Sequence, residues 1–146
     1  MNKATALLQT LEDLTFETYI ELSEALSVID DNKIDDEMAR QPAIYAYYSG
    51  LLTVAHKRRK EAELNLERYA AETWAQQKAA STTKQTARDL DAFVKKTTEY
   101  SLYTKCVDEA YSKYTLIKSL VTSLEQKKDM LVQRSSNRRA ETNLYR

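Results

Sequence analysis

The sequence predicts an all-α protein built around a long antiparallel helical hairpin that resembles a coiled coil, and three observations support this. A single glycine and a single proline among 146 residues leave too few turn residues for sheets or glycine-rich nucleotide loops. Apolar residues recur at spacings of three and four over long stretches. A composition of 42% hydrophobic and 30% charged residues is typical of neither a membrane-spanning nor a disordered chain.

An acidic N-terminal helix and turn are expected over residues 1–41. Residues 3–29 carry apolar side chains at helical spacing, and a break near 13–15 remains open because Thr15 is able to start a second helix there. The short polar side chains of residues 30–33 favour a turn, since they bond their own backbone. Asp35 is then expected to cap a brief further turn.

Residues 42–80 are expected to form the second helix. It should begin at Pro42, because a proline lacks the N–H that is unpaired at the first helical position anyway. Gly50 lies inside it and costs roughly 1 kcal/mol relative to alanine. Its presence indicates either a close contact with another helix or a hinge.

Residues 86–134 are expected to form the third helix, after a turn at 81–85. Thr86 and Asp89 match a capping box that starts it. Its apolar seam keeps steps of three and four, although the seam is polar between Thr97 and Thr104. Residues 135–146 are expected to leave the helix at Ser135-Ser136-Asn137 and to form a mobile basic tail.

The two long helices should bury too little surface by themselves. Each stripe has about two apolar residues per heptad, which is narrower than the stripe of a core-facing bundle helix. The hairpin therefore needs the first helix, other copies of the chain, or both. We expect a homo-oligomer in which residues 1–146 form a single helical domain.

The net charge of zero conceals an uneven distribution. Residues 1–41 hold three bases against ten acids, residues 42–85 seven bases against four acids, and residues 86–146 twelve bases against eight acids. Two explanations remain open: the charges neutralise each other within an assembly, or the acidic segment covers a basic surface that binds a polyanion.

The basic surface has two candidate groups of residues. Four consecutive cations stand in the middle of the second helix, and an arginine pair lies near the C-terminus between Arg134 and Arg146: Lys57, Arg58, Arg59, Lys60, Arg138 and Arg139. Successive helical residues surround the axis, so one of the four must approach the seam, and Arg58 is expected to do so. The run either binds phosphates or is a solvated face paired with Glu61 and Glu63.

Seven of the ten tyrosines form two groups, one near the start of the second helix and one on the third, at Tyr45, Tyr47, Tyr48, Tyr100, Tyr103, Tyr111 and Tyr114. They suit subunit contacts, where a phenol keeps its hydroxyl wet. The alternative is a platform on which bases of single-stranded nucleic acid stack.

Enzymatic chemistry is not expected. One cysteine, Cys106, and one histidine, His56, cannot build a zinc site or a disulfide, so we expect no metal, no cofactor and a reducing compartment. His56 is expected at the surface or a subunit contact, and Cys106 to be partly buried. No apolar run is long enough to span a membrane and the N-terminus lacks a cleavage site, so the chain is expected in the cytoplasm.

The layout resembles the phage recombination mediators of the UvsY type. The resemblance rests on a short acidic lead helix, Ile34-Asp35-Asp36-Glu37-Met38 before a proline, the tyrosine-containing helix over 43–52, the basic run, and a long helix that ends in Leu131 and Arg138-Arg139-Ala140-Glu141. Lys57 and Arg59 match a Lys-x-Arg pair with which such proteins contact DNA. The Tyr47-Tyr48-Ser49-Gly50 turn precedes the basic run here, whereas in the family it follows.

The resemblance implies a non-enzymatic oligomer that binds single-stranded DNA in phage DNA recombination and repair. Its implied partners are a recombinase and the single-strand binding protein that the recombinase displaces. The alternative is a helical interaction module, namely a scaffold, assembly chaperone or inhibitor with no nucleic-acid role.

Overall fold

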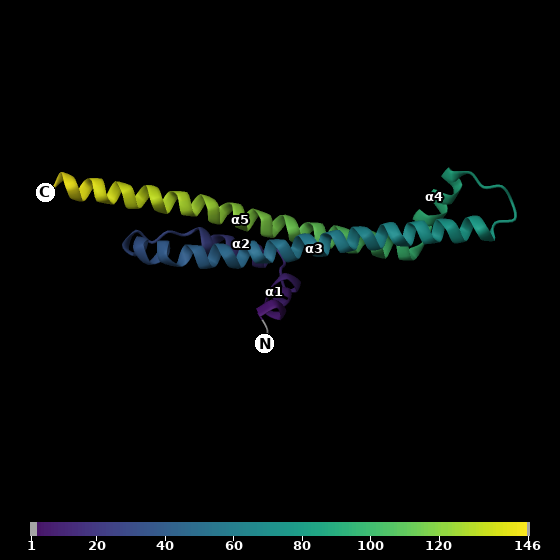
Figure 1. Cartoon of the computed structure of the whole chain (residues 1–146), viewed down its shortest axis with the longest axis horizontal. Coiled ribbons are helices and arrows are strands. Elements are labelled where there is room, and N and C mark those ends of the chain that lie inside the picture. The colour runs from purple at the N-terminus through teal and green to yellow at the C-terminus, as the bar shows by residue number, and fades with distance from the viewer. Residues whose placement is uncertain (1–2, 146) are drawn as a thin grey trace. The chain divides into compact units, whose positions relative to one another are not determined.

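A computed structural model describes residues 3–145, and it is all-helical over that range, as predicted. The helices are α1 Lys3–Glu12, α2 Phe16–Ser27, the 3-10 turn η1 Asp31–Lys33, α3 Ile34–Ala80, α4 Ala87–Lys96 and α5 Thr98–Leu144 (Figure 1). The chain divides into two compact units. Unit 1 comprises the residues up to Ala55 together with those from Lys113 onward, and unit 2 comprises His56–Ser112.

The N-terminal segment forms two helices, and the break that the sequence left open at residues 13–15 is confirmed. The Thr15 hydroxyl accepts the N–H of Thr18 at 3.2 Å, and the Thr18 hydroxyl accepts the N–H of Thr15 at 2.8 Å. This reciprocal capping box satisfies two amides at the start of α2. The turn at residues 30–33 is also confirmed, because the Asp30 carboxylate accepts the N–H of Asn32 at 2.9 Å.

The second helix does not begin at Pro42, so that prediction was wrong. Helix α3 begins at Ile34 and carries Pro42 in its interior. Three acids, Asp35–Glu37, occupy its first turn, where the helix dipole favours negative charge. Proline in a helix interior costs about 3 kcal/mol. Tertiary contacts on both sides of the proline offset this cost, because Gln41 before it and Tyr48 after it are both buried.

The third helix is interrupted, so the prediction of one helix over 86–134 was also wrong. Thr97 separates α4 from α5 with an extended backbone, φ −68° and ψ 145°. Its hydroxyl donates to the carbonyl of Val94 at 2.7 Å and accepts the N–H of Tyr100 at 3.3 Å. The Tyr69 hydroxyl adds a third bond to it at 2.8 Å. One short polar side chain therefore caps both helix ends.

The prediction for the start of α4 is confirmed, whereas the prediction for the end of α5 was wrong. The predicted capping box is confirmed, because Thr86 and Asp89 exchange hydrogen bonds at 3.1 and 3.2 Å. The basic tail was a wrong prediction, because α5 continues to Leu144. Thr142 and Arg139 bond to residues one turn earlier, so polar side chains in this segment accommodate the helix instead of ending it. Arg146 lies outside the described residues.

The core of unit 1 draws on α1, α2, α3 and α5. Its buried cluster consists of Leu11, Leu14, Tyr48, Leu51, Ala55, Ile117, Leu120, Val121 and Leu124. Within this unit α3 and α5 run in opposite directions, since Glu37 pairs with Lys127 and Tyr45 bonds Glu125. The N-terminal helices thus cover apolar surface that a two-helix pair leaves open.

Gly50 does not mark a close contact between helices. A Cβ added at this position meets nothing within 4 Å, and α3 passes through it without interruption. The close-contact interpretation was therefore wrong.

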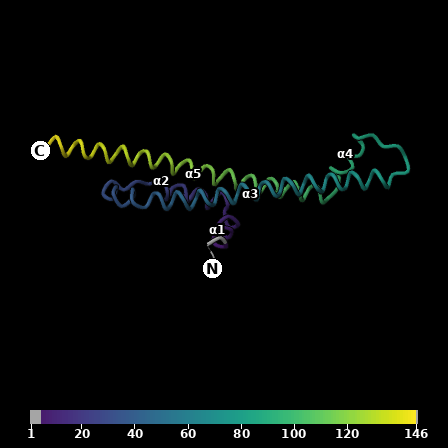
Figure 2. The backbone as a smooth tube through the Cα atoms, viewed as in Figure 1, coloured from purple at the N-terminus to yellow at the C-terminus, as the bar shows by residue number. Residues whose placement is uncertain are grey.

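Unit 2 has a thin core. Among its residues only Leu90 and Val94 are buried, and both belong to α4, which Figure 2 shows turned away from the line of α5. Helices α3 and α5 meet here through half-buried side chains, among them Tyr69 and Tyr103, whose ring centroids lie 5.0 Å apart. The two helices again run in opposite directions, because Arg59 lies at Tyr111 and Tyr69 at Tyr103.

Candidate nucleic-acid interface

The basic run of α3 lies in unit 2 and presents its members to different degrees. Lys57 and Lys60 are exposed, with 78% and 55% of their side-chain surface accessible. Arg58 and Arg59 are half-buried, and the Arg59 side chain is 25% exposed. The outward ammonium groups are therefore accessible to a large polyanion, whereas the guanidinium of Arg59 is held against the protein.

Glutamates one turn further along α3 pair with three of these cations. Arg59 Nε donates to Glu63 Oε1 at 2.8 Å, Lys60 Nζ lies 3.1 Å from Glu63 Oε2, and Lys57 Nζ lies 3.9 Å from Glu61 Oε1. The bonds from Arg59 and Lys60 lower the pKa of the Glu63 carboxyl, so it stays ionised at neutral pH. The pairing with Glu61 and Glu63 is thus confirmed, but the Lys57–Glu61 pair is exposed on both sides, and exposed pairs of this kind are weak.

Arg59 also contacts α5. Its guanidinium carbon lies 4.9 Å from the centre of the Tyr111 ring, within the range of a cation–π contact. Arg58 was the member of the run predicted to approach the seam, and this contact of Arg59 was not predicted. The residue opposite Arg59 depends on the register of α3 against α5, which the spacing of residues along one helix does not determine.

The second predicted group, Arg138 and Arg139, lies in unit 1 on the exposed side of α5. Both arginines line a shallow hollow together with Asp35, Met38, Ser135 and Thr142. Arg139 bonds Ser135 weakly, at 3.4 Å. Unlike the basic run, this hollow combines two cations with two hydroxyl groups. The Asp35 carboxylate offsets part of the positive charge of the two arginines.

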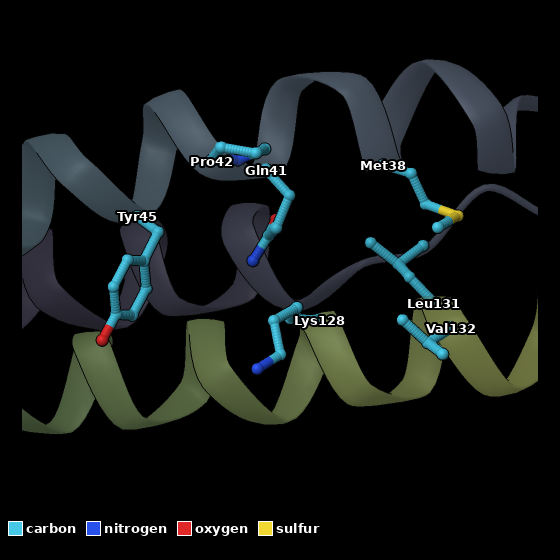
Figure 3. A pocket seen from close by; sticks show the side chains of 7 residues that line it. All are labelled: Met38, Gln41, Pro42, Tyr45, Lys128, Leu131 and Val132. Carbon is cyan, nitrogen blue, oxygen red and sulfur yellow. The ribbon is translucent and has the colours of Figure 1, made fainter.

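Unit 1 also contains an apolar pocket between α3 and α5 (Figure 3). It measures about 280 Å³ and is lined by Met38, Gln41, Pro42, Tyr45, Lys128, Leu131 and Val132. Gln41, only 5% exposed, donates its amide N–H to the carbonyl of Leu124 at 2.8 Å. The Tyr45 hydroxyl reaches Glu125 at 2.9 Å. This lining suits an apolar contact better than acid–base chemistry.

The remaining reactive side chains are dispersed. His56 is exposed, in agreement with a surface position, whereas Cys106 is exposed and not partly buried as predicted, because it lies on the outer face of α5. Within residues 3–145, no three His, Cys, Asp or Glu side chains gather in a way that could hold a metal ion. Over the same range, no helix combines the length and apolarity needed to cross a membrane.

Comparison of the chain with protein-family models, with curated proteins and with solved structures finds no match.

Proposed function

We propose that the protein is a non-enzymatic, single-stranded DNA-binding protein that acts as an accessory to recombination. The binding surface is the basic run of unit 2, with the arginine pair of unit 1 as a second contact: Lys57, Arg58, Arg59, Lys60, Arg138 and Arg139. The observation that carries the proposal is the exposure of Lys57 and Lys60 beside an arginine that is already fixed on an aromatic ring.

The phosphate backbone is the ligand that this surface suits best. Cations that neutralise phosphates release condensed counterions, and that release drives binding without regard to sequence. The competing glutamates do not prevent this, because the next turn of α3 holds two carboxylates, Glu61 and Glu63, against the four cations at 57–60. A phosphate replaces a weak, solvent-exposed carboxylate beside Lys57 and neutralises positive charge that the two glutamates leave uncompensated.

The mediator role rests on the resemblance to the UvsY type. It assigns a recombinase and a single-strand binding protein as partners, and the cytoplasm of a phage-infected cell as the location. The proposed form is a homo-oligomer in which α3 and α5 make a coiled-coil-like hairpin. The thin core of unit 2 supports this, because its helices leave apolar groups half-covered in one copy. Light scattering on the purified chain measures the number of copies.

The binding surface is tested by fluorescence anisotropy with a labelled oligonucleotide at about 50 mM salt. The variant Lys57→Ala/Arg59→Ala should bind roughly tenfold more weakly. Its plot of log affinity against log salt should be shallower by about 1.4, the slope expected for two lost phosphate contacts on a single strand.

The matched control is Lys95→Ala/Lys96→Ala, which removes two exposed cations from α4 in the same unit. It should change affinity and salt slope much less. No binding by the wild type, or equal losses in both double variants, would reject this surface.

A helical interaction module is the second candidate function, and the apolar pocket lined by Met38, Pro42 and Leu131 favours it. This candidate predicts a stoichiometric protein partner retained from nuclease-treated extract, with no affinity for oligonucleotides. The anisotropy titration therefore separates the two functions.

A further inference from the structure

Tyr111 differs from the other tyrosines of unit 2 in its exposure and in its contact with Arg59. It is 53% exposed, whereas Tyr69, Tyr100 and Tyr103 are half-buried along the α3–α5 seam. The Arg59 guanidinium also lies against it, 4.9 Å from the ring centre. A large aromatic ring is thus displayed next to the basic run.

The Arg59–Tyr111 pair is held in place from two sides. Arg59 Nε donates to Glu63 Oε1 at 2.8 Å while its guanidinium lies over the ring. A planar guanidinium suits both roles, since it forks toward a carboxylate and stacks on an aromatic face. Little side-chain freedom remains to be lost when a ligand arrives, which favours binding.

The ligand chemistry follows from what surrounds the ring. Lys57 and Lys60 attract a phosphate backbone, and the ring offers an aromatic surface to the base that the backbone carries. Only an unpaired base can leave its stack to meet such a surface, because bases in a duplex are stacked between their neighbours. Phosphate contacts alone do not distinguish single-stranded from duplex DNA. The ring therefore adds selectivity for the single strand.

We propose that Tyr111, backed by Arg59, is a stacking site for one unpaired base and makes the basic surface selective for single strands. This inference rests on the proposed function, because it concerns the same surface. It adds Tyr111 to the site and the nucleobase to the groups that the site binds, which otherwise are phosphates.

The test compares two oligonucleotides of equal length, a thymidine strand and a strand whose sites are abasic. Both carry the same phosphates, but only the first offers bases. The wild type should bind the thymidine strand roughly tenfold more tightly. Tyr111→Leu should lose this difference and bind both strands like the abasic one, while Tyr111→Phe, which keeps the ring, should retain the difference.

The possible failures are distinguishable. Equal wild-type affinity for the two strands, or equal weakening of both by Tyr111→Leu, overturns the stacking site and leaves the phosphate surface intact. Absence of binding to either strand overturns the proposed function and the stacking site together. Circular dichroism of both Tyr111 variants checks that they fold, which the exposure of this side chain favours.

Discussion

The two units of the chain differ in how they bury apolar side chains. Of the thirteen apolar residues that are buried within the described part of the chain, eleven lie in unit 1, and only Leu90 and Val94 lie in unit 2. Unit 1 gathers four helices around its cluster, whereas unit 2 joins α3 and α5 through half-buried and polar groups. Because burial provides most folding free energy, stability should reside mainly in unit 1, and the proposed binding surface lies in the unit with the thinner core.

The largest expected effect comes from truncating matched leucines in the two units. Leu120→Ala removes a side chain that is fully buried in unit 1, and it should lower the free energy of unfolding by about 2–5 kcal/mol. Leu66→Ala, at a half-buried seam position of unit 2, should cost about 1 kcal/mol because its site is open to water. Urea unfolding followed by circular dichroism measures both, and equal losses would contradict the comparison.

Glu37 makes the folding stability of unit 1 depend on pH. The N–H of Asp30 and the ammonium of Lys127, each 2.9 Å away, hold its pKa below the ordinary value of 4.5. The ionised carboxylate therefore stabilises the fold above pH 4.5, and this contribution is lost as the pH falls through the lowered pKa.

Replacing Glu37 tests this contribution of the ionised carboxylate to stability. Glu37→Gln should cost about 1–3 kcal/mol at neutral pH and flatten the acid limb of the stability profile. The matched variant Asp89→Asn in unit 2, where the Thr86 hydroxyl and amide donate to the Asp89 carboxylate and lower its pKa at an exposed cap, should have a smaller effect. An unchanged acid limb in Glu37→Gln would be incompatible with the assigned role.

The hydrogen bonds at the Thr97 break should contribute to the stability of unit 2, where few apolar side chains are buried. Thr97→Ala removes the hydroxyl that caps both α4 and α5, and should cost about 0.5–2 kcal/mol. Tyr69→Phe removes one bond to that hydroxyl and should cost about 1 kcal/mol. Hydrogen exchange at the amides of residues 98–101 should accelerate in both variants, and unaltered exchange there would show that another group holds the break.

The smallest effect is expected at Gly50, and it has the opposite sign. Gly50→Ala adds a Cβ that has open space around it and raises helix propensity. The free energy of unfolding should increase by up to about 1 kcal/mol, with a higher melting temperature. A loss of stability would indicate that the glycine is needed for a contact or a bend.

The sequence predicted helices where local chemistry determines them. The capping box of Thr86 and Asp89, the end of α3 at Ala80 and the possible break at Thr15 depend on residues within one turn. The errors at Pro42 and Thr97 arose because long-range bonds decide those positions, from Gln41 to Leu124 and from Tyr69 to Thr97. The candidate site divides in the same way: its glutamate pairs follow from helical spacing, but the contact of Arg59 with Tyr111 depends on register.

The central claim is that phosphates bind the basic run in competition with its glutamates, and neutralising a glutamate tests it most directly. Glu61→Gln should tighten binding of a thymidine oligonucleotide roughly threefold at low salt, because Lys57 loses its competitor while the Glu63 contact that holds Arg59 stays in place. The control Glu67→Gln removes one exposed acid from the same helix and unit, and should tighten binding much less. Equal affinities of the wild type and both variants would contradict the claim.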